Sequence, residues 1–234
     1  MNKEEYIRED FAEISSTNDY AKAKRTEGKN RIVTAKRQTG GRGTKGRSFV
    51  STEGGVYVTK LRFYENLPAA EAFTIMAQAA VAVCRTLEFY DIKPVIKWAN
   101  DIYVADKKIC GILIENVFSG KNVRSSVVGV GLNVVNELPQ ELCEIATTMQ
   151  KTTGKTYSVE EVRERLVSEL CREVDMQEYL SRVGYMGVEA TLIFEGESLR
   201  GKLLSVDEQG GLWVEIDGEK RRLTAAEVSV KIAR

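Results

Sequence analysis

The stretch QTGGRGTKGRSF, residues 38–49, decides which folds the chain can adopt. It contains four glycines and three cations (Arg42, Lys45 and Arg47), and it holds no acidic side chain that would neutralise them. Because glycine permits positive φ and close backbone approach, successive N–H groups can turn inward to enclose an anion. Arginine and lysine add charge-assisted donors that suit phosphate or carboxylate. The stretch therefore predicts a clamp for a phosphate-bearing ligand, with a solvated surface loop as the simpler alternative.

The segments that flank this loop exclude three familiar folds with glycine-rich loops. Strand-like runs lie on each side, at residues 31–36 and 56–63, whereas a dinucleotide-binding loop leads into a helix. A protein kinase needs an H-R-D catalytic loop, and the sequence contains no histidine. A Walker loop needs Gly-Lys-Ser/Thr, and Gly46-Arg47-Ser48 lacks the lysine. The absence of histidine also excludes imidazole bases, and it leaves chemistry that depends on positioning and charge stabilisation.

Length and composition indicate a globular protein with an anionic ligand. The 234 residues fit one large domain, or a domain with a small companion. A hydrophobic share of 43% with 29% charged residues is ordinary for a soluble protein. The formal net charge is zero, yet residues 22–47 hold ten Lys or Arg against one acid, Glu27. This local excess indicates an anionic ligand, whereas the neutral total argues against a dedicated nucleic-acid binder.

Cysteine spacing and hydropathy point to the cytoplasm. The four cysteines are far apart and form no C-x-x-C pair, so we expect buried free thiols in a reducing compartment. They are Cys84, Cys110, Cys143 and Cys171. No apolar run approaches about 18 residues, and the N-terminal MNKEE is not a signal peptide. We therefore expect a cytoplasmic protein with no membrane segment.

Two capping boxes and one proline predict three helices. Ser16-x-x-Asp19 opens a short helix over residues 18–27, which Gly28 ends. Leu67-Pro68 opens a long helix with an apolar stripe that is core rather than a cofactor site. The stripe consists of Phe73, Met76, Ala77, Ala80, Val81, Cys84 and Leu87. Ser158-x-x-Glu161 opens a helix that continues to about Leu180, with Val162, Leu166, Cys171 and Val174 facing inward.

From Val188 onward the pattern changes to short strands separated by glycine turns. The strands are expected at residues 190–194, 199–206, 212–216, 220–224 and 228–232. Asp217-Gly218 is a type I′ hairpin signal. We expect a small, partly open β-barrel here.

Polar residues interrupt the buried strands before this module. Asn100-Asp101 beside Lys97-Trp98 is either an Asx turn or a site at a strand end. Lys108 enters a strand that is apolar on both faces, so either a carboxylate neighbour or a ligand anion must answer its charge. The glycines on these strands, Gly111, Gly129 and Gly131, most simply mark close packing or a bulge. At the N-terminal end, Ser16, Thr17 and Asn18 can cap their helix or present polar groups to a ligand, and capping is favoured.

Four segments together resemble, in order, the biotin–protein ligases. They are Ser16-Thr-Asn18, the loop at 41–49, Lys97-Trp-Ala-Asn-Asp101 with Lys108…Gly111-Ile-Leu-Ile-Glu115, and Gly129-Val-Gly-Leu-Asn133. The resemblance covers essentially the whole chain and implies an α+β fold. That fold is a mixed β-sheet with helices on one face, as in class II synthetase-like catalytic domains, followed by a small C-terminal SH3-like β-barrel. It implies a catalytic domain at residues 1–186 and the barrel at 187–234. No N-terminal DNA-binding domain is expected, and hence no repressor role.

The resemblance also implies an activity and a site. Biotin's carboxylate would attack the α-phosphorus of MgATP to give biotinyl-5′-AMP and pyrophosphate, and a carrier lysine would then take the biotin. The catalytic residues would be Lys108, Arg42 and Asp101. Biotin would contact Ser16, Thr17, Asn18, Gln38, Gly41, Arg42, Gly43, Thr44, Lys108, Gly111, Ile112 and Leu113. The nucleotide would contact Arg42, Arg47, Phe49, Lys97, Trp98, Asn100, Asp101, Lys108 and Asn133. No metal ligands are assigned and no tightly bound cofactor is expected. The expected partners are biotin, ATP and a biotin carboxyl carrier domain, with a homodimer as a possible assembly and no DNA.

Three positions depart from the pattern of the family, and two other functions compete. Thr44, Phe49 and Ala99 stand where arginine, tryptophan and proline are usual. Of these, Thr44 removes a loop cation, so we expect the acyl-adenylate to be held less tightly. A lipoate–protein ligase would share the fold and the adenylate chemistry, although a dithiolane would require a more apolar lining than Gln38 and its neighbours offer. A non-catalytic RNA-binding module would instead show salt-sensitive RNA binding and no pyrophosphate release.

Overall fold

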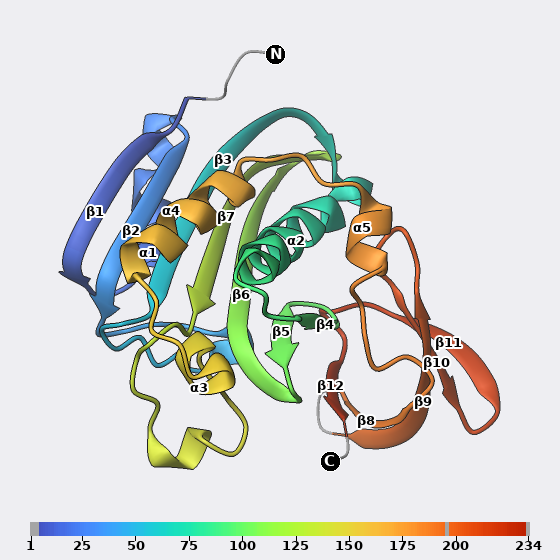
Figure 1. The fold of residues 1–234 in the computed structure, drawn as a ribbon. Coiled ribbons are helices and arrows are strands. Elements are labelled where there is room, and N and C mark those ends of the chain that lie inside the picture. The colour runs from blue at the N-terminus through green and yellow to red at the C-terminus, as the bar shows by residue number, and fades with distance from the viewer. Residues whose placement is uncertain (1–4, 195–196, 233–234) are drawn as a thin grey trace.

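The computed structural model describes residues 5–194 and 197–232, which form a large mixed sheet, its helices and a smaller C-terminal sheet (Figure 1). The large sheet has the strand order β1-β2-β3-β7-β6-β5-β4. Strands β1 and β2 pair in parallel, and the other neighbours pair antiparallel. The strands are β1 Ile7–Ile14, β2 Arg31–Gln38, β3 Val56–Pro68, β4 Val95–Lys97, β5 Asp101–Val104, β6 Lys107–Ser119 and β7 Asn122–Leu132. The strand-like runs on both sides of the glycine-rich loop are thereby confirmed as β2 and β3.

Helices cover both faces of this sheet. The long helix α2 (Phe73–Phe89) and helix α4 (Val159–Leu170) pack on one face, over a core that includes Val58 and Val128. Helix α1 (Thr17–Ala23) packs on the other, where Ala21 meets Leu61 and Val127. Successive residues of a strand point to opposite faces, which is why Val127 and Val128 belong to different cores. The expected mixed sheet is confirmed. The expectation that helices cover only one of its faces is wrong, because α1 covers the second face.

The long helix begins later than its sequence signal indicates. Leu67 and Pro68 end strand β3, where they pair with Val123 and Asn122 after a register shift. Proline is tolerated there because the end of a strand can dispense with its N–H. A 3₁₀ turn at Ala69–Glu71 follows, and α2 starts at Phe73. The predicted start of the helix at Leu67-Pro68 is therefore wrong.

The apolar stripe of α2 is core, as expected. Ala77, Ala80, Val81, Cys84 and Leu87 are buried, whereas Phe73 and Met76 are half-buried. The segment Ala69–Phe89 is long and apolar enough to cross a membrane, because an 18-residue stretch of it has a mean hydropathy of 1.3. However, 56% of that stretch is buried inside the protein. Its composition is thus accounted for by packing against the sheet.

The predicted helix from residue 159 to about 180 is two helices. Ser158 caps α4, its Oγ accepting from Glu161 N at 3.3 Å, and the helix ends at Leu170. Asp175 caps a new helix, α5 (Met176–Leu180), by accepting from Gln177 N at 3.1 Å. Because the chain leaves the helical path between them, Cys171 is exposed, and its predicted burial is wrong. Of the other cysteines, Cys84 and Cys110 are buried and Cys143 is half-buried, and all four are free thiols.

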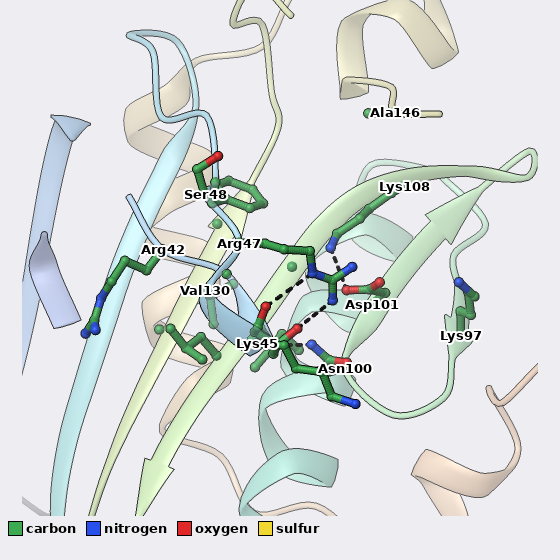
Figure 2. A pocket seen from close by; sticks show the side chains of 18 of the residues that line it. Arg42, Lys45, Arg47, Ser48, Lys97, Asn100, Asp101, Lys108, Val130 and Ala146 are labelled. Atoms are coloured by element: carbon green, nitrogen blue, oxygen red, sulfur yellow. Dashed lines mark hydrogen bonds and ion pairs between the residues drawn. The ribbon is translucent and has the colours of Figure 1, made fainter. Parts of the chain in front are cut away.

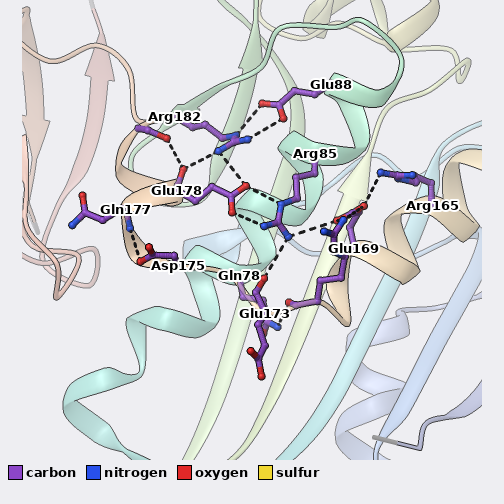
Figure 3. A network of polar contacts seen from close by, with 12 residues as sticks. Gln78, Arg85, Glu88, Arg165, Glu169, Glu173, Asp175, Gln177, Glu178 and Arg182 are labelled. Carbon is purple, nitrogen blue, oxygen red and sulfur yellow. Dashed lines mark hydrogen bonds and ion pairs between the residues drawn. The ribbon is translucent and has the colours of Figure 1, made fainter. Parts of the chain in front are cut away.

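A network of ion pairs ties α2, α4 and α5 together (Figure 3). Its centre is Glu169, whose side chain is 2% exposed and whose carboxylate pairs with three arginines. These are Arg85 at 3.7 Å, Arg165 at 2.8 Å and Arg172 at 3.0 Å. Arg85 also pairs with Glu178 of α5. A buried carboxylate is costly unless it is paired, so this network joins the helices that back the sheet.

The C-terminal sheet follows the predicted strands to within about one residue. It has the order β11-β10-β9-β8-β12 and is antiparallel throughout. Its strands are β8 Glu189–Ile193, β9 Ser198–Val206, β10 Leu212–Ile216, β11 Glu219–Leu223 and β12 Ser229–Ile232. Asp217 (φ 51°) and Gly218 (φ 81°) take the left-handed angles that a type I′ turn requires. Because β11 and β12 are the two edges of this sheet, the barrel is open. The domain boundary expected after residue 186 stays a prediction.

Candidate functional site

A cavity of about 800 Å³ lies above strands β6 and β7. It gathers residues from the glycine-rich loop, α1, the β4–β5 turn, residues 138–146 and strand β12. Every site residue expected from the sequence lines it except Gly41. Gly41 belongs to the loop but does not line the cavity, and a Cβ added to it would overlap the Phe49 carbonyl and Ser51 Oγ. Sequence segments more than a hundred residues apart thus meet at one site.

One end of the cavity is lined by neutral polar groups that bond to one another. Ser16 Oγ accepts from Asp19 N at 3.2 Å, so the predicted capping role of Ser16 is confirmed. Thr17 donates to Gln38 Oε1 through both its backbone N (2.8 Å) and its Oγ1 (2.9 Å). Gln38 Nε2 donates to Ser51 Oγ at 3.0 Å. The side chains at this end therefore present both donors and acceptors in fixed orientations.

The amide of Asn18 completes this polar end. Asn18 is 5% exposed, its Oδ1 accepts from Thr59 Oγ1 at 2.7 Å, and its Nδ2 donates to Glu115 Oε2 at 3.3 Å. A Cβ added at Gly129 on β7 would overlap Asn18 Oδ1. Gly129 is therefore a glycine for close packing, as the sequence indicated.

An aromatic slot comes next along the floor. Gly111 of β6 and Gly131 of β7 are partners in the sheet. The ring of Phe49 lies directly on them, so that a Cβ added at Gly131 would overlap it and one at Gly111 would lie 3.1 Å from it. The missing side chains of the two glycines leave room for a flat apolar group on the sheet.

The charged end holds a lysine and a carboxylate in contact (Figure 2). Lys108 Nζ lies 2.6 Å from Asp101 Oδ1, and both side chains are partly buried. A register shift between Ile102 and Tyr103 sets Tyr103 opposite Lys108 and Asp101 opposite Gly111. Bulges of this kind re-aim side chains next to sites. Of the two alternatives for Lys108, a carboxylate neighbour is the one realised in this structure.

The cations of the glycine-rich loop point in different directions. Arg47 lies beside the Lys108–Asp101 pair, and it donates to Thr44 O at 3.2 Å and to Thr44 Oγ1 at 2.8 Å (Figure 2). Arg42 points away from that pair (Figure 2). The loop turns through Lys45 (φ 55°) and Gly46 (φ 72°), two residues with left-handed backbone angles.

Arg42 belongs to an ion network on the α1 side of the cavity. Its Nη2 lies 2.5 Å from Asp19 Oδ1 and 3.5 Å from Glu115 Oε2. Lys22 pairs with the same two carboxylates, at 2.8 and 2.9 Å. Partial burial disfavours the ionised form of Asp19, but the hydrogen bond and charge of Lys22 with the charge of Arg42 outweigh it and lower the pKa of Asp19.

The β4–β5 turn and Asn133 are held by other parts of the protein. Trp98 is 7% exposed, and its Nε1 donates to Gly210 O at 3.0 Å. Asn100 Nδ2 donates to Ile112 O at 2.9 Å. Lys97 Nζ lies 5.1 Å from the centre of the Tyr103 ring. Asn133 Nδ2 donates to Thr147 O at 3.1 Å, which ties β7 to the segment that follows it.

Several lining residues were not anticipated. Met76, Tyr103, Leu138, Glu141, Leu142, Ile145 and Ala146 line the cavity, as do Ile193, Ala225, Val228, Ser229, Val230 and Lys231 of the C-terminal module. The helical spacing of Met76 predicts a core position and gives no sign of its place in the cavity. The β12 residues carry no local signal for a ligand site, because they reach the cavity only through the packing of the two sheets.

Comparison with known proteins agrees with the fold. The model of the biotin/lipoate A/B protein ligase family matches residues 11–133. The bifunctional ligase/repressor BirA of Bacillus subtilis is 30% identical over 216 residues, which cover 85% of this chain and 66% of that protein. This chain thus spans just under two thirds of the BirA sequence. The biotin--[acetyl-CoA-carboxylase] ligase of Paracoccus denitrificans is 25% identical over 84% of this chain and 88% of its own.

Solved structures show the same architecture over nearly the whole chain. The biotin protein ligase from Aquifex aeolicus in complex with biotin and ATP superposes with a TM-score of 0.73 and 29% identity, and covers 97% of this chain and 99% of that one. Its apo structure gives a TM-score of 0.77 at 25% identity, with 98% and 100% coverage. Since the family model matches more than half of the sequence, the chain belongs to the biotin/lipoate A/B protein ligase family.

Proposed function

We propose that this protein is a biotin–protein ligase that works through biotinyl-5′-AMP. The order of groups along the cavity floor carries the proposal. Asn18 lies against Gly129, the apolar slot follows at Gly131 and Gly111, and Lys108 comes last. Biotin has the same order of chemistry, with a neutral ureido ring, an apolar chain and a carboxylate. A site whose buried polar groups would lose their partners with another ligand discriminates strongly against that ligand.

In the first step, a biotin carboxylate oxygen attacks the α-phosphorus of MgATP. The new O–P bond forms as the bond to the bridging oxygen breaks, and pyrophosphate leaves. Lys108 would stabilise the carboxylate and the charge that develops on the phosphate, a preorganised electrostatic role. To do so, the Lys108 ammonium group must leave the Asp101 carboxylate and bind the ligand instead. Arg47 and the backbone at Gly43 and Thr44 would close over the acyl-phosphate.

In the second step, the ε-amine of a carrier lysine attacks the acyl carbon. The C–O bond to the phosphate breaks, AMP leaves, and the amide keeps the biotin. Asp101 is the proposed acceptor of the ammonium proton, because the departure of Lys108 toward the ligand frees its carboxylate. Phe49, Lys97, Trp98, Asn100 and Asn133 would lie on the nucleotide side. The ring of Phe49 would leave Gly111 and Gly131 so that the biotin chain can take its place in the slot.

The remaining components follow from the same proposal. Magnesium enters with ATP as part of the substrate, and hard cations of this kind commonly bind phosphates with one or two carboxylates. The acceptor is a biotin carboxyl carrier domain, and the setting is the cytoplasm. The name of the Paracoccus relative supports a carboxylase as the source of the acceptor domain. The four free thiols suit the reducing environment of the cytoplasm. A homodimer stays a prediction.

Incubation with biotin, MgATP and a carrier domain, followed by the mass of the carrier, tests the proposal. We expect the mass to rise by one biotinyl group, and pyrophosphate to be released only when biotin is present. The matched arm replaces biotin with lipoate. Lipoylation of the carrier instead of biotinylation would show that the protein is a lipoate–protein ligase. Neither product, with salt-sensitive RNA binding instead, would support the non-catalytic alternative.

A further inference from the structure

The three residues of the turn between β4 and β5 lie outside the strand pairing that joins β4 to β5. Strand β4 ends at Lys97 and β5 begins at Asp101, and these two residues face each other across the turn. Trp98, Ala99 and Asn100 lie between them. Strand β6 holds one side of this segment, because Asp101 pairs with Gly111 and Asn100 exchanges two hydrogen bonds with Ile112, one at 3.0 Å through its backbone O and one at 2.9 Å through its Nδ2. How Trp98 and Ala99 lead the chain into Asn100 depends on the contacts that these two residues make outside the large sheet.

A buried tyrosine holds the middle of the turn. Tyr179 of α5 is fully buried, and its hydroxyl donates to the Ala99 carbonyl at 3.2 Å. Burial raises the pKa of the Tyr179 phenol far above physiological pH, so the group stays protonated and able to donate. Tyr179 does not line the cavity, whereas Ala99, which accepts its hydrogen bond, does.

The C-terminal module holds the start of the same turn. The indole N–H of Trp98 donates to the carbonyl of Gly210, which lies in the turn between β9 and β10. Gly210 has a φ of +78°, and Asp207 stabilises its turn by accepting from Gly211 N at 2.8 Å. Trp98 and Ala99 accordingly belong to the core of the C-terminal sheet rather than to that of the large sheet.

One phenylalanine connects the two supports. The rings of Phe73 and Tyr179 meet edge to face, with centroids 5.3 Å apart and planes at 84°. Phe73 also lies against Gly210, where an added Cβ would overlap the ring. The contacts therefore close into a ring that runs from Ala99 through Tyr179, Phe73 and Gly210 to Trp98. We call this the turn clamp.

We propose that Tyr179 is a positioning residue, and that the turn clamp sets Asn100 and Asp101 relative to Lys108. Tyr179 acts through the Ala99 backbone and touches neither substrate nor reacting atoms. The C-terminal module thereby becomes a structural support of the active site and not only a neighbour to it. The inference rests on the proposed function, since it assigns the clamped turn to ATP and the carrier lysine.

Tyr179→Phe tests this with Tyr57→Phe as its matched control. Tyr57 is also buried (1% exposed), and its hydroxyl also donates to a backbone carbonyl, that of Thr52 at 2.6 Å, but away from the turn. Each variant keeps its ring and loses one buried hydrogen bond. The measurements are kcat/KM for MgATP in biotin-dependent pyrophosphate release, the Kd for biotin, and the thermal midpoint.

The turn clamp predicts a selective effect. Tyr179→Phe should lower kcat/KM for MgATP about tenfold, the scale of one lost hydrogen bond, and leave the Kd for biotin within about twofold. Tyr57→Phe should lower the thermal midpoint to a similar extent and leave both constants within about twofold of wild type. Trp98→Phe, which breaks the clamp at Gly210, should reproduce the loss in kcat/KM and keep the affinity for biotin.

Three results would overturn the inference. They are an unchanged kcat/KM in Tyr179→Phe, an equal loss in Tyr57→Phe, or a loss of biotin affinity as large as the loss in kcat/KM. Either of the last two would mean that the hydroxyl contributes only to general stability. If the wild-type protein releases no pyrophosphate with biotin, the proposed function itself is wrong. If the wild type turns over normally and the variants are unaffected, only the inference about Tyr179 is wrong.

Discussion

Replacement of Lys108 by alanine separates its catalytic role from its structural one. The Lys108 side chain is 29% exposed and that of Asp101 19%, so their 2.6 Å pair lies near the surface. Loss of such a pair should lower the free energy of unfolding by only about 1 kcal/mol. Loss of one preorganised group that stabilises a developing charge costs about 3–4 kcal/mol in the transition state. We therefore expect a fall of about 10²–10³ in the rate of adenylate formation, with a fold that survives.

The assay is single-turnover release of pyrophosphate with biotin and MgATP. Lys107→Ala is the matched control, because Lys107 is the adjacent lysine but donates to Cys143 O at 2.8 Å and does not line the cavity. The control should release pyrophosphate within about threefold of wild type, since neither Lys107 nor its partner Cys143 lines the cavity. Near-normal release by Lys108→Ala, with an intact thermal transition, would refute the electrostatic role of Lys108.

Four further predictions concern the loop and the polar end. Arg42→Ala should weaken the ligand-dependent ordering of the loop, and protease sensitivity that is unchanged with biotin bound would contradict this. Thr44→Arg should slow the release of biotinyl-5′-AMP, as measured by loss of the intermediate from preloaded enzyme, and equal release rates would count against a missing loop cation. Because its pKa is lowered in the fold, ionised Asp19 stabilises the protein above its ordinary pKa of 3.8, and this contribution is lost as pH falls through the lower folded value. Acid unfolding of Asp19→Asn should lack that component, and identical acid profiles would exclude it. Gly131→Ala should place a methyl group in the slot that the Phe49 ring now fills and biotin would enter, and so weaken biotin binding measured by calorimetry, whereas an unchanged Kd would show that the slot is not used.

Local sequence signals were sufficient for strands β2 and β3, on the two sides of the glycine-rich loop, and for the five strands of the C-terminal sheet. Capping boxes with Ser16 and Ser158 marked true helix starts, because a cap satisfies backbone N–H groups that the helix itself cannot. Glycines on β6 and β7 indicated close approach, and the groups that approach are Asn18 and Phe49. The candidate site residues could be named because four weak motifs occurred in a specific order.

What escaped prediction depends on contacts between distant segments. The helix expected to continue to Leu180 stops at Leu170, where Asp175 offers a second cap and burial of Glu169 among arginines fixes the end. The contribution of β12 to the cavity and the bond from Tyr179 to Ala99 arise only when the two sheets and α5 are packed. No periodicity in the sequence encodes such pairs, because the residues are 80 positions apart or more.

The exchange of partners by Lys108 is the central claim, and a crystal structure with bound biotinyl-5′-AMP tests it most directly. The account predicts Lys108 Nζ at about 2.8 Å from an acyl-phosphate oxygen, with residues 40–49 folded over the ligand and Asp101 released. It would be contradicted by a complex in which Lys108 still lies 2.6 Å from Asp101 and the loop stands away from the ligand.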